Sequence, residues 1–315
     1  MKINKRMIYA IGETLLDIIF TNNEPTTAKP GGSALNSSVS LGRMNIPVSF
    51  ISEWGTDKVG QLINNFLKKN NVITKNVYRY NDTLTTVAMA FLDKNKDADY
   101  QFYKNFPKKR LNIKLPKFYL DDMLLFSSYF AINKEVRPKF LEIVKKAKSE
   151  GALIIYDPNF RKSHANELHE LKNLILENIS LADIVRGSDE DFENIFGVNN
   201  SEEAYKKIKK AGCFNLIYTA NKNGVYIHSG KFQKQYEVPQ IKPVSTIGAG
   251  DNFNAGIIYG LYKNNITKNK LMNSTTNQWD NIVQLGINFA TDACLRYENY
   301  ISIDFAKKNR NTGYT

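Results

Sequence analysis

Short apolar runs alternate with amphipathic segments along most of this chain, and this alternation is the strongest constraint on its fold. The runs at 151–156 and 215–219 are almost entirely apolar, as strands covered on both faces must be. Strands are expected at 7–11, 48–51, 123–126, 151–156, 183–185 and 215–219, and helices at 36–45, 61–69, 137–150, 167–179, 202–211, 255–262 and 282–295. This order predicts a parallel sheet between two layers of helices.

Two stretches depart from that order. Residues 85–106 alternate apolar and polar side chains around a polar break at 93–99, the pattern of an antiparallel hairpin. Residues 15–20 also have strand character, and a loop is expected at 21–30. We expect a small sheet inserted into a single α/β domain. The predicted main domain comprises 1–12, 34–83 and 107–315, and the predicted β lid comprises 13–33 and 84–106.

Composition excludes several classes of protein. The 315 residues carry a formal charge of +12, which suggests anionic partners, but the basic residues are scattered. We therefore favour a solvated basic surface over a nucleic-acid interface. Cys213, Cys294 and three histidines do not supply the spacing of a structural zinc site. No run approaches the ~20 apolar residues that cross a bilayer. Few cysteines and no signal-peptide core lead us to expect a cytoplasmic protein without membrane contacts.

The most informative motif is Ser-Thr-Ile-Gly-Ala-Gly-Asp at 245–251, just before an apolar helix. Its glycines permit unusual backbone angles and expose N–H groups where the helix dipole is positive, which favours an anion. Asp251 could serve as a helix cap or as a base. By itself the motif fits an ordinary glycine turn and capped helix equally well.

Two further motifs contain polar groups suited to a ligand. Gly31 and Gly32 allow a polar molecule to approach the backbone, and Asn36 offers a donor and an acceptor. Together with Asp17 they would suit adjacent sugar hydroxyls, although a simple loop and helix start is the favoured interpretation of the segment alone. Asp-Pro-Asn-Phe-Arg at 157–161 follows a buried strand, where ligand crevices lie. Arg161 could contact phosphate or substrate oxygens, or be a surface residue of a turn.

Taken in order, these motifs resemble the ribokinase-like (PfkB) family of carbohydrate kinases. The resemblance extends from about residue 8 to residue 295. It rests on Gly-Gly-x-x-x-Asn at 31–36, Gly-x-Asp-x-x-Gly at 55–60, Asp-Pro-Asn-x-Arg at 157–161, and the motif at 245–251. The third motif resembles the fructokinase and ketodeoxygluconate-kinase branches, and the lid residues 100–105 resemble the fructokinase branch. The resemblance implies a three-layer α/β/α sandwich with a mostly parallel sheet and a small β-sheet lid.

The same resemblance implies roles for individual residues. Asp251 would be the general base that takes the proton of a sugar hydroxyl, which then attacks the γ-phosphate of ATP. The N–H groups of Gly248, Ala249 and Gly250 would form an anion hole, with Mg²⁺ bridging the β- and γ-phosphates. The implied sugar-binding residues are Asp17, Gly31, Gly32, Asn36 and Arg161. The implied nucleotide-binding residues are Ser188, Thr219, Gly224 and Thr246.

Three positions depart from the family pattern. Ser188 and Asp191 replace the Asn and Glu of the family's Asn-x-x-Glu motif, so contact of Asp191 with Mg²⁺, through water, would need a longer reach. Ser245 replaces an aspartate that helps to bind a monovalent cation in ribokinases. No glycine-containing segment that would complete that cation site is evident at 295–303. We therefore expect weak or no activation by potassium.

The sequence leaves the substrate and the assembly open. Fructokinase-like activity is the leading hypothesis; 2-keto-3-deoxygluconate, ribose or a nucleoside are alternative acceptors. A catalytically silent sugar or nucleotide sensor is an alternative of another class. The exposed edge of the lid could pair with a second copy to form a homodimer.

Overall fold

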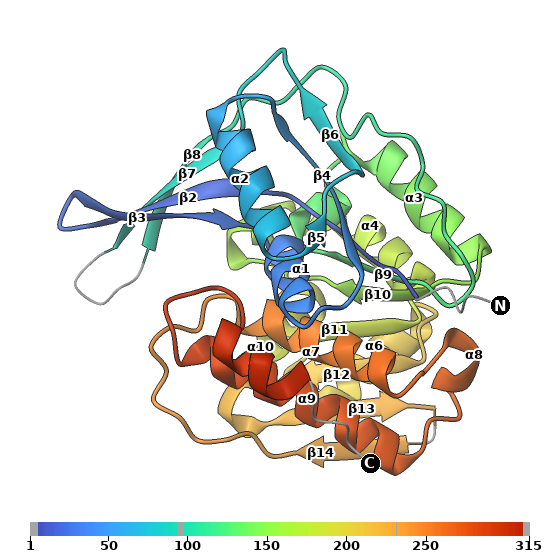
Figure 1. Cartoon of the computed structure of the whole chain (residues 1–315). Coiled ribbons are helices and arrows are strands. Elements are labelled where there is room, and N and C mark those ends of the chain that lie inside the picture. Colours follow the sequence, from blue (N-terminus) through green and yellow to red (C-terminus); the bar gives the residue numbers. More distant parts are fainter. Residues whose placement is uncertain (1–5, 93–97, 231, 311–315) are drawn as a thin grey trace.

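The apolar runs form one large sheet in the computed structural model, which describes residues 6–92, 98–230 and 232–310 (Figure 1). The strand order is β14-β13-β12-β11-β10-β9-β1-β4-β5, and β6 also pairs with β4. Pairing is parallel from β5 to β12, and β13 and β14 add an antiparallel hairpin at one edge. The strands are β1 (Ile8–Ile11), β4 (Val48–Gly55), β5 (Val72–Ile73), β6 (Val77–Tyr80), β9 (Met123–Ser127), β10 (Leu153–Asp157), β11 (Ile184–Ser188), β12 (Asn215–Thr219), β13 (Val225–Ser229) and β14 (Phe232–Tyr236).

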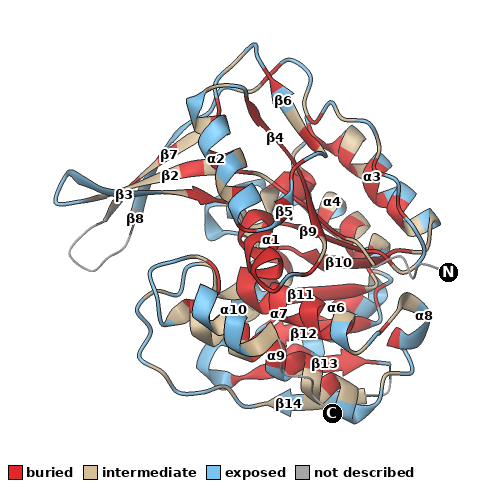
Figure 2. Ribbon diagram, viewed as in Figure 1, coloured by how far each residue is buried: buried red, intermediate tan, exposed pale blue. Residues whose placement is uncertain are grey.

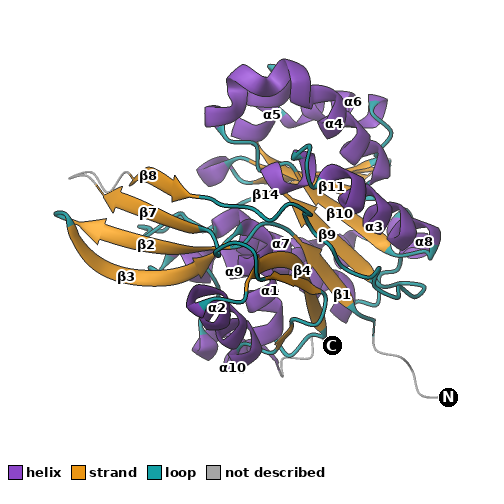
Figure 3. Ribbon diagram, turned by 90° about the horizontal axis from the view of Figure 1, so that it is seen from above, coloured by secondary structure: helices purple, strands orange, loops and turns teal. Residues whose placement is uncertain are grey.

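Helices cover both faces of this sheet (Figure 3). One layer contains α1 (Ser33–Arg43), α2 (Lys58–Lys69), α7 (Ala249–Lys263), α8 (Lys268–Leu271), α9 (Thr276–Cys294) and α10 (Ile303–Arg310). The other contains α3 (Arg137–Ser149), α4 (Leu168–Leu181), α5 (Asp189–Phe196) and α6 (Ser201–Lys210). Short 3₁₀ turns are η1 (Tyr129–Ile132), η2 (Lys162–Glu167) and η3 (Asn221–Asn223).

Side chains of the central strands enter two separate hydrophobic cores, one under each helical layer. In β1, Ile8 and Ala10 pack in the core that includes α7 and α9, whereas Tyr9 and Ile11 pack in the core that includes α3 and α4. Successive side chains of a strand point to opposite faces, so a fully apolar strand fills both cores. Figure 2 shows that the central strands, α1 and α7 are buried along most of their length.

A second, smaller sheet projects from one end of the main body (Figure 3). Its order is β3-β2-β7-β8, built from β2 (Leu15–Thr21), β3 (Glu24–Gly31), β7 (Val87–Leu92) and β8 (Ala98–Tyr103). We call it the lid sheet. All four strands fall within the two segments expected to form a lid, and β3 ends only two residues before α1 begins. The three-layer fold with a separate small sheet is thus confirmed.

Several sequence expectations are wrong in detail. The loop expected at 21–30 is largely the strand β3, because its backbone pairs with β2 although its side chains are polar and mostly exposed. The helix α7 starts at Ala249 rather than at residue 255, and α10 follows the helix expected to close the chain. The strands β5, β6, β13 and β14 and the helix α5 were not expected. Residues 93–97 of the expected polar break lie outside the described residues.

Candidate active site

The carboxyl ends of the parallel strands bring the predicted site residues to one edge of the main sheet. Asp157, Ser188 and Thr219 are the last residues of β10, β11 and β12. The amino ends of α1 and α7 meet this edge, since side chains of α1 contact Asp251. In parallel α/β folds, ligands bind in the crevice outside this end of the strands. The fold therefore assembles segments more than 200 residues apart in the sequence.

The amino end of α7 depends on Gly248. This residue has a φ of 80°, and a Cβ there would lie 2.7 Å from the Asn299 carbonyl oxygen. Glycine is therefore required both for the left-handed backbone and for the close approach. The Ala249 N–H donates to the carbonyl of Thr246 at 3.2 Å. Within the described residues, the N–H groups of Gly248 and Gly250 have no acceptor, so they can bind an anion.

Asp251 lies in the first turn of α7 and is almost fully buried. Ser33 Oγ donates to its Oδ1 at 2.5 Å, and Asn36 Nδ2 donates to its Oδ2 at 2.8 Å. Ser127, at the end of β9, donates in turn to Ser33 Oγ at 3.1 Å. Burial raises the pKa of Asp251, and the hydrogen bonds from Ser33 and Asn36 oppose that rise.

Asn36 has one polar atom free for a ligand. Its Nδ2 is bonded to Asp251, but its buried Oδ1 has no partner within the described structure. A buried acceptor without a partner costs about 1–3 kcal/mol, so a ligand hydroxyl that donates to it would bind favourably. Gly32, which begins α1, has a φ of 130°, and a Cβ there would lie 2.2 Å from the Glu13 carbonyl oxygen. The absence of a side chain at Gly32 therefore allows the start of α1 to lie close to the segment that leads into the lid sheet.

Asp17 extends from β2 of the lid sheet beside Gly31. A Cβ at Gly31 would lie 2.2 Å from Asp17 Oδ2, so only glycine fits there. No side chain or backbone donor of the described residues bonds this carboxylate. Burial alone raises the pKa of Asp17 to about 6. Burial raises the pKa of Tyr100 in β8, and the nearby Asp17 charge raises it further.

Arg161 begins the 3₁₀ turn η2 and is exposed to solvent. Its positive charge lowers the pKa of both Asp251 and Tyr100, although burial outweighs it in each case. Arg161 thus interacts with the helix side and with the lid side of the same crevice. The structure brings it together with Asp251, and its side chain has no carboxylate partner among the described residues.

A buried network that the sequence motifs did not indicate lies behind the start of α7. Arg186 Nη1 donates to Asp157 Oδ2 at 3.0 Å, and Nη2 donates to Thr219 Oγ1 at 2.7 Å. Asn254 Nδ2 also donates to Asp157 Oδ2, at 2.6 Å. One signal was available: Arg186 precedes Ser188 by two residues in the same strand, so both side chains lie on the same face of the sheet. Ser33, whose hydrogen bond to Asp251 was also not predicted, lies inside the motif at 31–36.

Ser188 and Asp191 form a capping box at the start of α5. Ser188 Oγ accepts from the Asp191 N–H at 3.1 Å, and Asp191 Oδ2 accepts from the Ser188 N–H at 2.7 Å. The other carboxylate oxygen accepts from the Phe160 N–H at 2.6 Å. Burial and the nearby Asp157 charge raise the pKa of Asp191. Both oxygens therefore already have backbone donors, and Asp191 ties α5 to the segment that contains Arg161.

The remaining nucleotide-side residues lie on neighbouring loops. Thr219 is paired in register with Ser188 and donates to the Gly187 carbonyl at 3.3 Å. Gly224, after η3, has a φ of 101°, and a Cβ there would lie 2.3 Å from the Tyr236 carbonyl oxygen. Thr246 is exposed on the loop before α7. No cluster of three or more His, Cys, Asp or Glu side chains in the described ranges could hold a metal ion.

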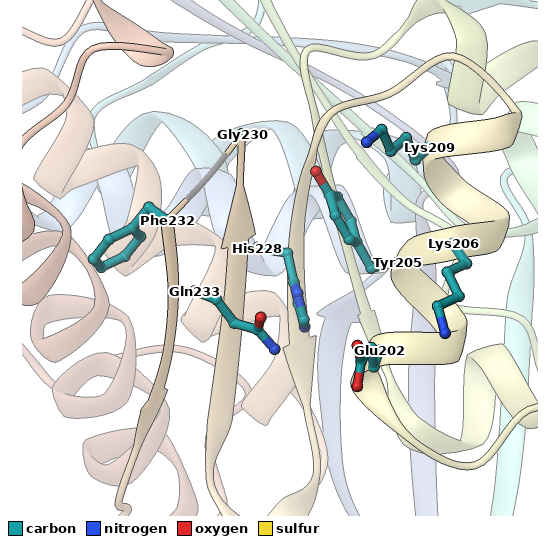
Figure 4. Close-up of a pocket in the computed structure, with 8 residues that line it drawn as sticks. All are labelled: Glu202, Tyr205, Lys206, Lys209, His228, Gly230, Phe232 and Gln233. Atoms are coloured by element: carbon teal, nitrogen blue, oxygen red, sulfur yellow. The ribbon is translucent and has the colours of Figure 1, made fainter.

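Two surface pockets occur elsewhere. One, of about 240 Å³, lies between α6 and the β13–β14 hairpin and is lined by Tyr205, Lys206 and His228 among others (Figure 4). The other, of about 820 Å³, is bordered by Tyr78, Lys114 and neighbouring residues. Neither includes Asp17, Asn36 or Asp251. Among the helices that the structure describes, none has the length and apolar character needed to cross a membrane.

Comparison with known proteins identifies the family and the fold. The model of the "pfkB family carbohydrate kinase" matches residues 5–302. A fructokinase of Vibrio alginolyticus is 23% identical over 279 residues, covering 87% of this chain and 90% of the relative. A probable fructokinase-2 of Arabidopsis thaliana is 24% identical over 263 residues, covering 79% and 80%. The solved aminoimidazole riboside kinase of Salmonella enterica superimposes with a TM-score of 0.82 at 18% identity, covering 97% of this chain and all of that one. This chain belongs to the pfkB family of carbohydrate kinases, which are sugar phosphotransferases.

Proposed function

We propose that this protein is an ATP-dependent sugar kinase of the fructokinase type, with Asp251 as its general base. One observation carries the proposal: the buried carboxylate of Asp251 lies in the first turn of α7, beside the N–H groups of Gly248 and Gly250, which have no acceptor among the described residues. A hydroxyl bonded to that carboxylate would lie next to an anion bound at the helix start. This is the arrangement that transfer of a phosphoryl group to a hydroxyl requires.

In the proposed step, Asp251 accepts the proton of the sugar hydroxyl as the oxygen forms a bond to the γ-phosphorus. The bond from that phosphorus to the oxygen bridging to the β-phosphate breaks, and ADP leaves with its electron pair. The N–H groups of Gly248, Ala249 and Gly250 would stabilise the developing charge. Gly248 and Gly250 can do so as they stand, whereas Ala249 would have to give up its bond to Thr246.

The sugar would lie between α1 and the lid sheet. Asn36 Oδ1 is a buried acceptor and the Asp17 carboxylate a half-buried one, and neither has a donor in the described structure. Sugar hydroxyls would supply those donors. Gly31 and Gly32 allow the Asp17 carboxylate and the Glu13 carbonyl to lie against the chain here, because a Cβ at either position would lie 2.2 Å from one of these groups. Arg161 would contact substrate or phosphate oxygens from the opposite side of the crevice.

ATP would lie along the ends of β11 and β12, near Ser188, Thr219, Gly224 and Thr246. The described residues form no ready-made cage for Mg²⁺, and both oxygens of Asp191 already accept backbone N–H groups. The side chains present therefore do not fit a protein-held metal ion. Mg²⁺ usually reaches such sites bound to nucleotide phosphates with few protein ligands, which is how we propose it enters here.

Measurement of ADP release tests the proposal. Purified protein with ATP and Mg²⁺ should release ADP with fructose; ribose, 2-keto-3-deoxygluconate, aminoimidazole riboside and a nucleoside complete the panel. Asp251→Asn should lower kcat by about 10²–10⁴-fold while ATP still raises the melting temperature. Asp304→Asn, which alters a carboxylate in the first turn of α10, is the matched control and should keep full activity. Near-normal turnover of Asp251→Asn would refute the role as base.

The panel also separates the alternative functions. The names of the relatives favour fructose and aminoimidazole riboside as acceptors of the phosphoryl group. Turnover with only one of these two would identify the substrate branch of the family to which this enzyme belongs. Binding of sugar and ATP without ADP release would instead indicate a silent sensor. Pairing of the lid sheets of two copies remains a proposal, and analytical ultracentrifugation of the intact chain would test it.

A further inference from the structure

Arg186 lies directly behind the backbone that is proposed to hold the γ-phosphate. Its side chain is mostly buried, and a Cβ added at Gly250 would lie 2.8 Å from Nη1. The second glycine of the motif at 245–251 therefore leaves room for the Arg186 guanidinium. Gly250 has no positive φ that would otherwise require glycine. Its missing side chain allows a cation to approach the anion hole.

The other contacts of Arg186 hold the guanidinium without using all of its donors. Nη1 bonds Asp157, Nη2 bonds Thr219, and the guanidinium carbon is 5.5 Å from the centre of the Phe253 ring. The buried Nε has no partner in the described structure. A guanidinium has five N–H donors, and a carboxylate can bind two of them side by side. Here Asp157 accepts from one Nη only, since its Oδ2 also accepts from Asn254 and its Oδ1 from the Asn159 N–H.

We propose that Arg186 stabilises the negative charge of the transferring phosphoryl group, acting from behind Gly250 as the side-chain cation of the anion hole. This inference rests on the proposed function. Backbone N–H groups supply only partial positive charges, whereas a guanidinium keeps a full charge at every pH of interest. In a buried site such a charge interacts strongly with a developing anion. Asp157, Thr219 and Phe253 act as positioning residues that hold the guanidinium against α7.

The competing explanation is that Arg186 only neutralises the buried Asp157. Removal of Arg186 would then lower stability, and turnover with it, because it leaves the buried Asp157 carboxylate unpaired. The two explanations differ when both charges are removed together. A variant with Arg186→Met and Asp157→Asn has no unpaired carboxylate, so a purely neutralising role predicts that it recovers turnover. A role toward phosphate predicts recovered stability without recovered turnover.

Four variants therefore form the experiment: Arg186→Lys, Arg186→Met, Asp157→Asn and the double variant. With sugar and MgATP saturating, Arg186→Met should lower kcat by about 10²–10³-fold, as loss of one charge-stabilising group does. Arg186→Lys should recover most of that loss, and the KM for sugar should change less than threefold throughout. The double variant should melt near the wild-type temperature and remain as slow as Arg186→Met. Recovery of kcat in the double variant, or a change only in the sugar KM, would overturn the proposal.

A binding measurement separates this inference from the proposed function. A non-hydrolysable ATP analogue differs from ADP by the γ-phosphate, so the difference between their affinities, both measured by calorimetry with Mg²⁺, reports how well the protein binds that group. In Arg186→Met that difference should shrink at least tenfold, while ADP affinity changes little. This result would support the role of Arg186 even if no sugar were phosphorylated. An unchanged difference would refute it. If Arg186→Met does not fold, the double variant with Asp157→Asn, which has no unpaired carboxylate, should give the same shrinkage.

Discussion

Replacement of Asp17 by asparagine tests whether the lid carboxylate is kept for a ligand at the expense of stability. Asp17 lies half-buried beside Gly31 and has no donor in the described structure. The loss of solvent around it raises its pKa from 3.8 to about 6. Asparagine has nearly the same shape but cannot ionise. We expect Asp17→Asn to fold more stably than the wild type at neutral pH and to bind sugar less well.

The size and sign of the effect follow from the pKa. A rise of about two pKa units lowers the free energy of unfolding by up to ~3 kcal/mol once Asp17 is ionised in both the folded and the unfolded chain. Between pH 4 and pH 6 the folded chain keeps a proton on Asp17 that the unfolded chain releases, so stability falls as pH rises through this range. Above pH 6 the wild type carries the full penalty. The stability gain of Asp17→Asn should therefore be up to ~3 kcal/mol at pH 8 and should vanish near pH 4.

Urea unfolding at pH 8, 7, 6 and 5 measures this gain. Glu24→Gln, which changes an exposed carboxylate on β3 of the same sheet, is the control and should show no such pH-dependent gain. In kinetic assays Asp17→Asn should raise the KM for sugar by at least about tenfold and change kcat much less, because the carboxylate binds rather than reacts. A gain that is the same at every pH, or a loss of stability at pH 8, would refute the reasoning.

Two other measurements test parts of the structure outside the chemical step. Asp57 caps α2 through the Gly60 N–H at 2.8 Å and also accepts from the N–H and hydroxyl of Thr85, so Asp57→Ala should lower the free energy of unfolding by ~2 kcal/mol in urea titrations. A change below ~0.5 kcal/mol would contradict this capping role. Because Ser245 replaces an aspartate of the family's cation site, exchange of Na⁺ for K⁺ should change kcat less than twofold; a large rise would count against this.

The sequence predicts the main sheet well because its strands are continuous apolar runs. The strand at 215–219 was expected with the bounds that the structure has. Polar strands were missed, and β3 is the clearest case: its exposed side chains carry no apolar signal, and only pairing with β2 makes it a strand. The start of α7 was placed six residues late, because its first turn is formed by Gly250 and polar side chains that contact α1.

Candidate site residues could be proposed from the sequence where a short motif contains them. Asp251 and Asn36 were proposed from separate motifs, and the structure joins them by a hydrogen bond of 2.8 Å. Arg186 was not predictable in the same way. Its importance depends on the absence of a side chain at Gly250, more than 60 residues further along the chain, and on the approach of α7 to β11. A contact between distant segments leaves no periodic pattern that a single sequence could show.

The structure also bears on which of two carboxylates near the sugar acts as the base. Burial raises the pKa of both Asp17 and Asp251, so their acidity does not separate them. Their positions do: Asp251 shares the first turn of α7 with the open N–H group of Gly250, whereas Asp17 extends from the lid sheet. A hydroxyl bonded to Asp251 would lie beside a bound phosphate, and Ser33 and Asn36 fix the carboxylate in that pose. Because a base must be close to the bond that forms, we propose that Asp251 takes the proton and that Asp17 recognises a neighbouring hydroxyl.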